Sequence, residues 1–181
     1  MTALLFVHGG GDDAYRYDKD IVDRLQPLFG AGMRIDFPRI VGLEGLDWDA
    51  VAHDLGNTLR DLPQGSVVIA HSVGASAVVK LLAEGARPRL AHLFLLAPPY
   101  NGTDSEWGDT DFAFPPDLAA HLPRGLPITL YHSDDDEIIS ASNAKRYAAK
   151  IPEAETVIRH GGGHQFRGDL HFLAEAIMGV A

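Results

Sequence analysis

The 181-residue sequence contains no cysteine, which excludes disulfide bonds, cysteine-ligated zinc and a thiolate nucleophile. Basic residues are also scarce. The 15 Lys and Arg against 25 Asp and Glu give a net charge of −10, which repels phosphate backbones and anionic lipid. The chain starts without the basic segment of a signal peptide, and no apolar run approaches the roughly 20 residues of a membrane span. We therefore expect a cytoplasmic protein with no nucleic-acid partner and no membrane association.

Short apolar runs alternate with longer stretches of helical spacing. Strands are predicted at 3–7, 33–37, 66–70, 90–96, 128–131 and 156–159, and helices at about 18–29, 47–61, 73–84, 140–150 and 166–178. Most of the apolar runs lack inside–outside alternation, as is typical of strands covered on both faces. The pattern predicts an α/β fold, a three-layer sandwich in which a mostly parallel sheet of about six strands carries helices on both faces. At this length we expect one domain spanning residues 1–181.

The segment Ala70-His71-Ser72-Val73-Gly74 joins a buried strand directly to a helix through a serine. A turn this sharp strains the serine backbone and requires small residues two positions before and two positions after it. Ala70 and Gly74 satisfy that requirement. Such a turn exposes the hydroxyl of Ser72 and directs the N–H of Val73 toward a reacting carbonyl. The alternative at this stage is a serine that merely caps the helix.

This segment resembles the Gly-x-Ser-x-Gly nucleophile elbow of the α/β-hydrolase superfamily, with Ala70 in place of the first glycine. The resemblance covers nearly the whole chain, because the other family elements follow in the expected order. It implies a minimal α/β-hydrolase fold with the strand order 2-1-3-4-5-6. The short chain, in which the His-Gly strand comes first, is similar to the lid-poor serine hydrolases of the retinoblastoma-binding-protein-like group.

A serine nucleophile needs a base to take its proton and an acid to orient that base. His164 follows three glycines after the sixth predicted strand, and the parallel sheet brings this segment to the same edge as Ser72. His164 is therefore the predicted base. His160 is its competitor, although its place at the end of a strand favours a structural role.

The acid is predicted in the cluster Asp134-Asp135-Asp136-Glu137, which follows the fifth strand. The superfamily pattern places the catalytic aspartate just before a short apolar pair, and Ile138-Ile139 point to Asp136. Asp135 is the alternative. The order Ser, Asp, His is the one that the superfamily uses. The other acids are expected to face water, because like charges so close together repel one another when buried.

An oxyanion hole needs a second N–H besides that of Val73. The turn His8-Gly9-Gly10-Gly11 after the first strand resembles the His-Gly turn that supplies this donor in the superfamily. Position favours the N–H of Gly10, with Gly9 nearly equal. The glycines match neither a dinucleotide-binding motif nor a phosphate-binding loop, so a nucleotide is not expected.

The sequence also contains candidates for the walls of a substrate pocket. Its candidate residues are His8 and His71, which flank the predicted site, and Tyr100 and Trp107 from the irregular stretch between Ala97 and Asp117. Loops of that length are often lids or binding loops. Phe112 and Phe114 belong to the same stretch and are further candidates for an acyl pocket.

These features together predict a serine hydrolase that cleaves small carboxylic esters through an acyl-enzyme intermediate. A small-molecule ester is the expected partner, and neither a cofactor nor a metal is expected. Two alternatives remain open. One is a non-catalytic α/β-hydrolase-fold protein that binds a ligand or a protein. The other is a metal site built from the histidine and carboxylate side chains of His132, Asp134–Asp136, His160 and His164.

Overall fold

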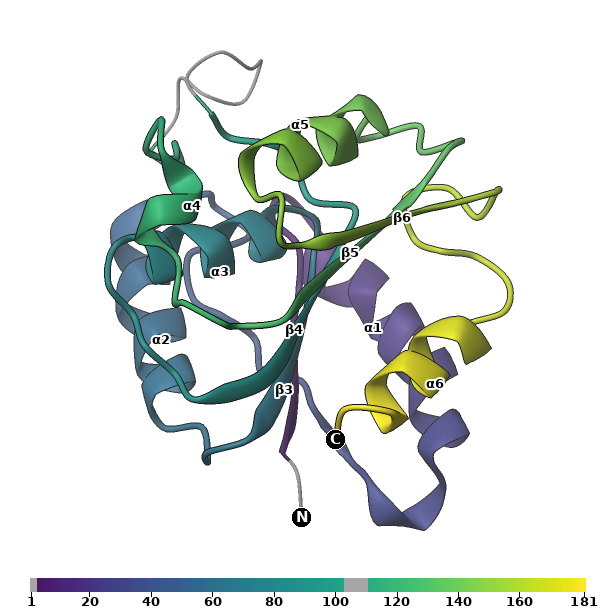
Figure 1. Ribbon diagram of the computed structural model, residues 1–181. Coiled ribbons are helices and arrows are strands. Elements are labelled where there is room, and N and C mark those ends of the chain that lie inside the picture. The colour runs from purple at the N-terminus through teal and green to yellow at the C-terminus, as the bar shows by residue number, and fades with distance from the viewer. Residues whose placement is uncertain (1–2, 103–110) are drawn as a thin grey trace.

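The computed structural model describes residues 3–102 and 111–181, and it contains one parallel sheet of six strands (Figure 1). The strands are β1 (Leu4–Val7), β2 (Ile35–Asp36), β3 (Ser66–His71), β4 (Leu90–Leu96), β5 (Ile128–Ser133) and β6 (Glu155–Arg159). Their order across the sheet is β2-β1-β3-β4-β5-β6, and every neighbouring pair is parallel. The predicted α/β fold class and strand order are confirmed.

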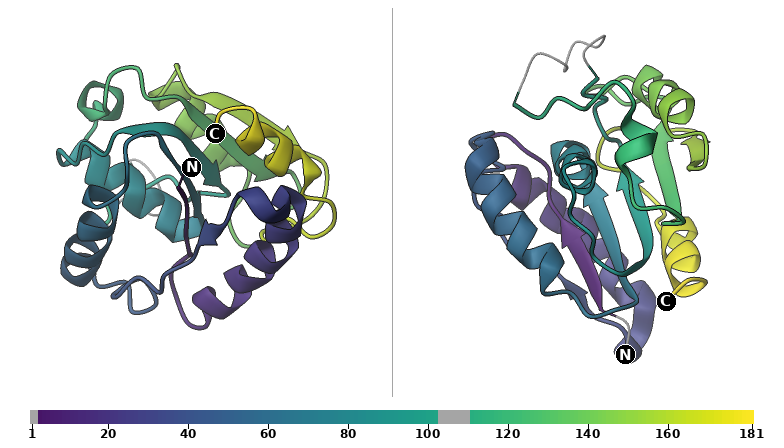
Figure 2. Two further views of the ribbon diagram at one scale, coloured as in Figure 1. Left: turned by 90° about the horizontal axis from the view of Figure 1, so that it is seen from below. Right: turned by 60° about the vertical axis from the view of Figure 1, so that its left-hand side comes forward.

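Helices cover both faces of the sheet (Figures 1 and 2). One face carries α1 (Ala14–Leu25), the short 3-10 helix η1 (Gln26–Gly32) and α6 (His171–Met178). The other face carries α2 (Trp48–Arg60), α3 (Ser72–Ala83), α4 (Leu118–His121) and α5 (Ser142–Lys150). The sheet is therefore the middle of three layers.

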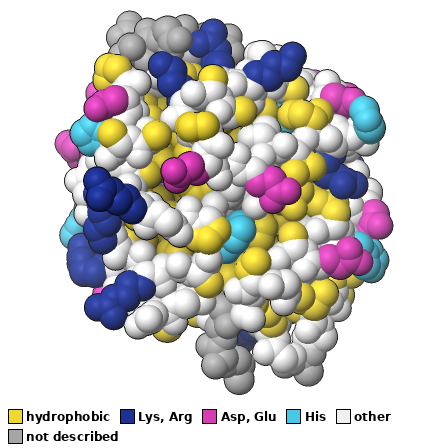
Figure 3. All heavy atoms as spheres, in the orientation of Figure 1, with side chains coloured by type: hydrophobic (Ala, Val, Ile, Leu, Met, Phe, Trp, Pro, Cys, Tyr) yellow, Lys and Arg dark blue, Asp and Glu magenta, His cyan; other side chains and the backbone are white. Residues whose placement is uncertain are grey.

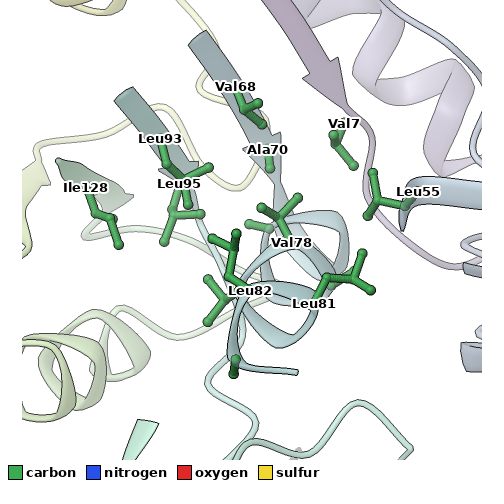
Figure 4. Packing of buried hydrophobic residues seen from close by; sticks show 14 of the residues in the cluster. Val7, Leu55, Val68, Ala70, Val78, Leu81, Leu82, Leu93, Leu95 and Ile128 are labelled. Atoms are coloured by element: carbon green, nitrogen blue, oxygen red, sulfur yellow. The ribbon is translucent and has the colours of Figure 1, made fainter. Parts of the chain in front are cut away.

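Two hydrophobic cores follow from the alternation of side chains along each strand. In β3, Val68 and Ala70 face the core that includes α2 and α3, which Figure 4 shows from close by. Val67 and Ile69 face the opposite core, with α1 and α6. Because both faces of β3 are buried, its sequence is continuously apolar rather than alternating.

Several element boundaries differ from those predicted. The helix expected at 18–29 is α1, which starts at Ala14, followed by η1 with Pro27 near its start. The helix expected from residue 166 begins only at His171, because Phe166 and Gly168 have φ values of 47° and 105°. The strand expected at 33–37 has only the two residues of β2, which lies at the sheet edge and pairs only with β1. Helix α4 was not predicted.

The surface drawn in Figure 3 carries its charges unevenly. Lys and Arg side chains gather on the side where α2 lies and along the edge where α5 lies, whereas acidic side chains are scattered over this face (Figures 1 and 3). Among the helices of residues 3–102 and 111–181, none combines the length and the hydropathy needed to cross a lipid bilayer.

Candidate active site

The serine between β3 and α3 lies in a strained turn. Ser72 has φ of 51°, a left-handed value that costs a non-glycine residue about 1–3 kcal/mol. Its hydroxyl does not cap the helix: the N-cap position of α3 is His71, which makes no side-chain capping bond. The Oγ of Ser72 instead lies 3.0 Å from Nε2 of His164. The interpretation of Ser72 as a capping residue is therefore wrong.

The small residues that flank Ser72 both lie in close packing. A Cβ atom placed on Gly74 would lie 2.0 Å from the carbonyl oxygen of His8, so α3 meets the turn after β1 without room for a methyl group. Ala70, which replaces the first glycine of the superfamily motif, is fully buried in the core beneath α3. Its methyl group is accommodated there.

We expect Gly74→Ala to lower the free energy of unfolding by about 1–3 kcal/mol, because the new methyl group must displace the backbone of His8. The matched control is Gly56→Ala in α2, where a Cβ meets nothing within 4 Å. There the helix propensity of alanine should raise the free energy of unfolding by up to about 1 kcal/mol. Urea denaturation of both variants measures the two effects, and equal changes in both would contradict the close approach at Gly74.

His164 lies between Ser72 and an acidic side chain. Its Nδ1 is 2.9 Å from Oδ2 of Asp136, while its Nε2 faces Ser72. Burial lowers the pKa of His164 below its ordinary value, and this effect outweighs the hydrogen bond to Asp136, which raises it. A neutral imidazole with its proton on Nδ1 leaves Nε2 free to accept a proton from the hydroxyl.

Asp136 accepts three hydrogen bonds. Its Oδ1 accepts the backbone N–H groups of Ile138 and Ile139 at 2.9 and 2.8 Å, and its Oδ2 lies 2.9 Å from Nδ1 of His164. Nε2 of His132, which lies 2.7 Å from the carbonyl oxygen of Ile139, is a further 3.3 Å neighbour of Oδ2. The side chain has no exposed surface. Burial alone would raise the pKa of Asp136, but the hydrogen bonds hold it well below its ordinary value. Asp136 is therefore a carboxylate at neutral pH.

The other acids of the cluster anchor the glycine-rich loop after β6. Their carboxylates accept backbone N–H groups of that loop: Asp134 from Gly161 at 3.0 Å, Asp135 from Gly163 at 2.9 Å and Glu137 from His164 at 3.4 Å. All three residues are exposed, as the sequence indicated. They fasten the loop that carries His164 to the loop after β5.

The two alternatives for the base and the acid bind other groups. The side chain of His160 is 95% exposed and pairs with Asp134 at 2.7 Å. Asp135 binds a backbone N–H and does not contact the His164 ring. In residues 3–102 and 111–181, no three His, Asp or Glu side chains form a group that could hold a metal ion.

Of the three predicted oxyanion donors, the N–H of Gly9 already has a hydrogen-bond acceptor. Its N–H donates to Oδ2 of Asp18 at 2.7 Å, so the prediction that Gly9 is an alternative donor is wrong. Within the described part of the chain, the N–H groups of Gly10 and Val73 have no acceptor. A Cβ on Gly10 would lie 3.0 Å from Cβ of Val73, so these two residues are neighbours. The first N–H groups of a helix, such as that of Val73, lack intrahelical acceptors.

A cavity of about 460 Å³ opens beside Ser72. Its walls come from the turn after β1, the start of α1 and the loops after β5 and β6. Among the described residues, the lining consists of Gly9, Gly10, Asp12, Ala14, Tyr17, Asp18, His71, Ser72, Glu137, Ile138, His164, Gln165 and Arg167. This volume lies within the range of small-molecule sites.

Of the residues predicted to line the pocket, some lie in the cavity wall and others do not. His71 lies in the cavity wall. His8 does not, because it is fully buried and its ring holds the backbone: Nε2 accepts the N–H of Ile40, and Nδ1 lies 2.7 Å from the carbonyl oxygen of Gly9. The prediction that His8 lines the pocket is therefore corrected.

The prediction that Tyr100 lines the pocket is also corrected, because this residue belongs to the core. Its ring packs edge-on against Phe114 and Tyr147, with ring centroids 5.8 and 5.4 Å apart. Phe112 and Phe114 are likewise buried in that core. Trp107 lies outside the described residues.

Asp18 was missed by the sequence analysis. It lies on α1, and its carboxylate pairs with Nδ1 of His71 at 2.8 Å, with both side chains 1% exposed. A signal was available: residues 18, 21, 22 and 25 form one helical stripe, and Asp18 is its only charged member, beside Ile21, Val22 and Leu25. A charged residue on a buried helix face requires a partner.

A parallel sheet with a strained serine between β3 and α3, and with a histidine and an aspartate from later loops beside it, defines an α/β-hydrolase. The comparison with protein families agrees, since residues 4–155 match the family described as "Alpha/beta hydrolase family". The chain belongs to this family. The closer resemblance to the retinoblastoma-binding-protein-like group stays a prediction.

Solved structures of the same fold cover nearly the whole chain. The ydeN gene product of B. subtilis is 17% identical with a TM-score of 0.77, and the match covers 99% of this chain and 98% of that one. A serine hydrolase from the polyaromatic-hydrocarbon-degrading bacterium Cycloclasticus zankles is 14% identical with a TM-score of 0.74, covering 98% and 88%. The esterase RhEst1 from Rhodococcus is 14% identical with a TM-score of 0.60, covering 98% and 89%. A search of curated proteins finds no match.

Proposed function

We propose that this protein is a serine hydrolase that cleaves small carboxylic esters through a Ser72–His164–Asp136 triad and an acyl-enzyme intermediate. The observation that carries the proposal is the pair of contacts made by one imidazole: His164 Nε2 lies 3.0 Å from Ser72 Oγ, and its Nδ1 lies 2.9 Å from Asp136. These distances are within the range that proton transfer requires.

In the first half of the reaction, Ser72 becomes acylated. His164 takes the hydroxyl proton on Nε2 while Oγ forms a bond to the ester carbonyl carbon. The carbonyl oxygen becomes an oxyanion that accepts hydrogen bonds from the N–H groups of Val73 and Gly10. Collapse of this intermediate breaks the bond to the alkoxy group, which leaves as an alcohol with the proton from His164. Asp136 stays ionised and stabilises the imidazolium.

The second half returns the enzyme to its starting state. His164 takes a proton from a water molecule, whose oxygen attacks the acyl carbonyl and forms a second oxyanion at Val73 and Gly10. The bond to Ser72 Oγ then breaks, and His164 returns its proton to the serine. The products are a carboxylic acid and an alcohol, and the proposed reaction needs no cofactor.

The cavity supports a small substrate. Its volume of about 460 Å³ suits a compact ester, and its walls combine the apolar side chain of Ile138 and the ring of Tyr17 with the charged groups of Asp12, Glu137 and Arg167.

A covalent probe tests the nucleophile directly. A fluorophosphonate should form a phosphorus–oxygen bond to Ser72 Oγ with loss of fluoride, and peptide mass spectrometry should locate the label on residue 72. Heat-denatured protein should remain unlabelled, because the activation of the serine depends on His164 and therefore on the fold. Folded protein that never reacts would contradict the proposal and would favour a non-catalytic binding protein.

A further inference from the structure

A second His–Asp pair lies directly beneath the proposed active site. Nδ1 of His71 is 2.8 and 2.9 Å from the two carboxylate oxygens of Asp18, and Nε2 is 2.9 Å from the backbone carbonyl oxygen of His164. Asp18 also accepts the N–H of Gly9. The pair thus links three segments: α1, the turn that carries Gly10, and the loop that carries His164.

The contacts of the His71 ring determine where its protons lie. A carboxylate and a carbonyl oxygen only accept hydrogen bonds, so each ring nitrogen must donate, and a histidine that donates from both nitrogens is an imidazolium. Burial disfavours this charge, but Asp18 outweighs burial and raises the pKa of His71 above its ordinary value. The pKa of Asp18 is lowered, because the attraction and hydrogen bond of His71 outweigh burial there as well.

The charge on His71 lies close to the proposed base. The ring centroids of His71 and His164 are 4.7 Å apart. Asp18 lies on the Nδ1 side of the His71 ring, and the backbone carbonyl group of His164 lies on the Nε2 side. The other acids near His164 are Asp136, on its Nδ1, and Glu137, on its backbone N–H.

We propose that His71 is a positioning residue that Asp18 holds permanently as an imidazolium. The positive charge of His71 keeps the neighbouring His164 unprotonated in mildly acidic solution. The His71 Nε2–H also holds the carbonyl group of His164 and thereby the loop that carries the base. The inference rests on the proposed function, in which His164 accepts the Ser72 proton. Neither His71 nor Asp18 enters the bond changes of the reaction.

Asp18→Asn is the sharpest test because it is nearly isosteric. The amide oxygen of asparagine still accepts the N–H of Gly9, and its NH₂ group donates to Nδ1 of His71, which must then give up one proton. Asp23→Asn is the matched control, since it removes an exposed carboxylate from the same helix, where Asp23 pairs only with Lys19 among the described residues.

Nitrogen-15 NMR of histidine-labelled protein reads the protonation states without any substrate. In the unmodified protein and in Asp23→Asn, both nitrogens of His71 should carry protons at pH 8. In Asp18→Asn one proton should be lost, and the midpoint of the His164 titration should move upward, because the positive charge of His71 lowers the pKa of His164 more than the carboxylate of Asp18 raises it. A neutral His71 in the unmodified protein would overturn the proposal.

The pH dependence of kcat/KM gives the second readout. A base must be neutral to accept a proton, so activity falls as the pH drops through the titration of His164. In Asp18→Asn this acid limb should move to higher pH, whereas a merely structural defect would lower the rate at every pH and leave the limb in place. If His71 is neutral in Asp18→Asn and the acid limb of that variant has not moved, the proposal is overturned.

Failure of the proposed function is distinguishable from failure of this inference. Absence of Ser72-dependent turnover would reject the esterase, while the NMR titrations would still decide the states of His71 and His164. If Asp18→Asn does not fold, His71→Gln serves in its place, because it removes the same positive charge and keeps an amide donor. The His164 midpoint should then rise further, since Asp18 remains ionised.

Discussion

Ser72→Ala should lower kcat for a p-nitrophenyl ester by about 10⁶, the largest effect expected for any single substitution in this protein. The hydroxyl supplies the atom that attacks the carbonyl, and alanine leaves His164 with nothing to deprotonate. A small rate above that in water should persist, because the N–H groups of Val73 and Gly10 still stabilise an oxyanion formed by attack of water. Spectrophotometric kinetics with highly purified variant measure the loss.

Ser133→Ala is the matched control for this experiment. Ser133 is a buried serine at the end of β5, and its Oγ has no hydrogen-bond partner in the described part of the chain. We expect its replacement to change turnover by less than a few-fold. Undiminished hydrolysis by Ser72→Ala would show that residue 72 is not the nucleophile, and an equal loss in both variants would indicate a general structural effect.

Asp136→Asn should lower kcat by about 10⁴ while the fold remains intact. The asparagine oxygen can still accept the N–H groups of Ile138 and Ile139, which leaves its NH₂ group facing His164. Nδ1 of His164 must then accept a hydrogen bond, and the ring proton moves to Nε2. In that tautomer Nε2 cannot take the proton of Ser72, so the base is lost although every heavy atom stays in place.

Asp135→Asn separates the two candidate acids. Its carboxylate is exposed and accepts only the N–H of Gly163 among the described residues, and asparagine offers the same oxygen. We expect kcat to stay within a few-fold of the unmodified value. A large loss in Asp135→Asn with little loss in Asp136→Asn would show that the acid is misassigned. Circular dichroism and thermal unfolding verify that both variants fold.

The choice of Asp136 from sequence had a physical basis that the structure makes visible. A turn that places Ile138 and Ile139 just after the acid directs their N–H groups back onto its carboxylate. The same turn buries Ile139 and leaves Asp135 and Glu137 outside. Local spacing therefore carries information about which aspartate is buried, because the contacts that hold it come from residues two and three positions away.

Local sequence spacing could not predict which aromatic and histidine side chains line the pocket. Tyr100 follows a strand that ends at the same edge of the sheet as Ser72, yet its ring turns into the core against Phe114 and Tyr147. His8 lies next to the proposed oxyanion donors, yet both of its nitrogens bind backbone. The sequence predicted the part of the fold in which these residues lie, but packing determined where their side chains point.

The resemblance to the α/β-hydrolase superfamily supplied the strand order. The sequence by itself determined the layers and the edge of the sheet at which Ser72, Asp136 and His164 meet. These depend on periodic burial and on right-handed crossovers between parallel strands, which are properties of local pattern. Only the tertiary structure decided which side chains line the cavity, that Gly9 is not a free donor, and that Asp18 pairs with His71 across 53 positions of the chain. Such contacts join residues that are distant in sequence, and their geometry exists only once α1 has packed against the sheet.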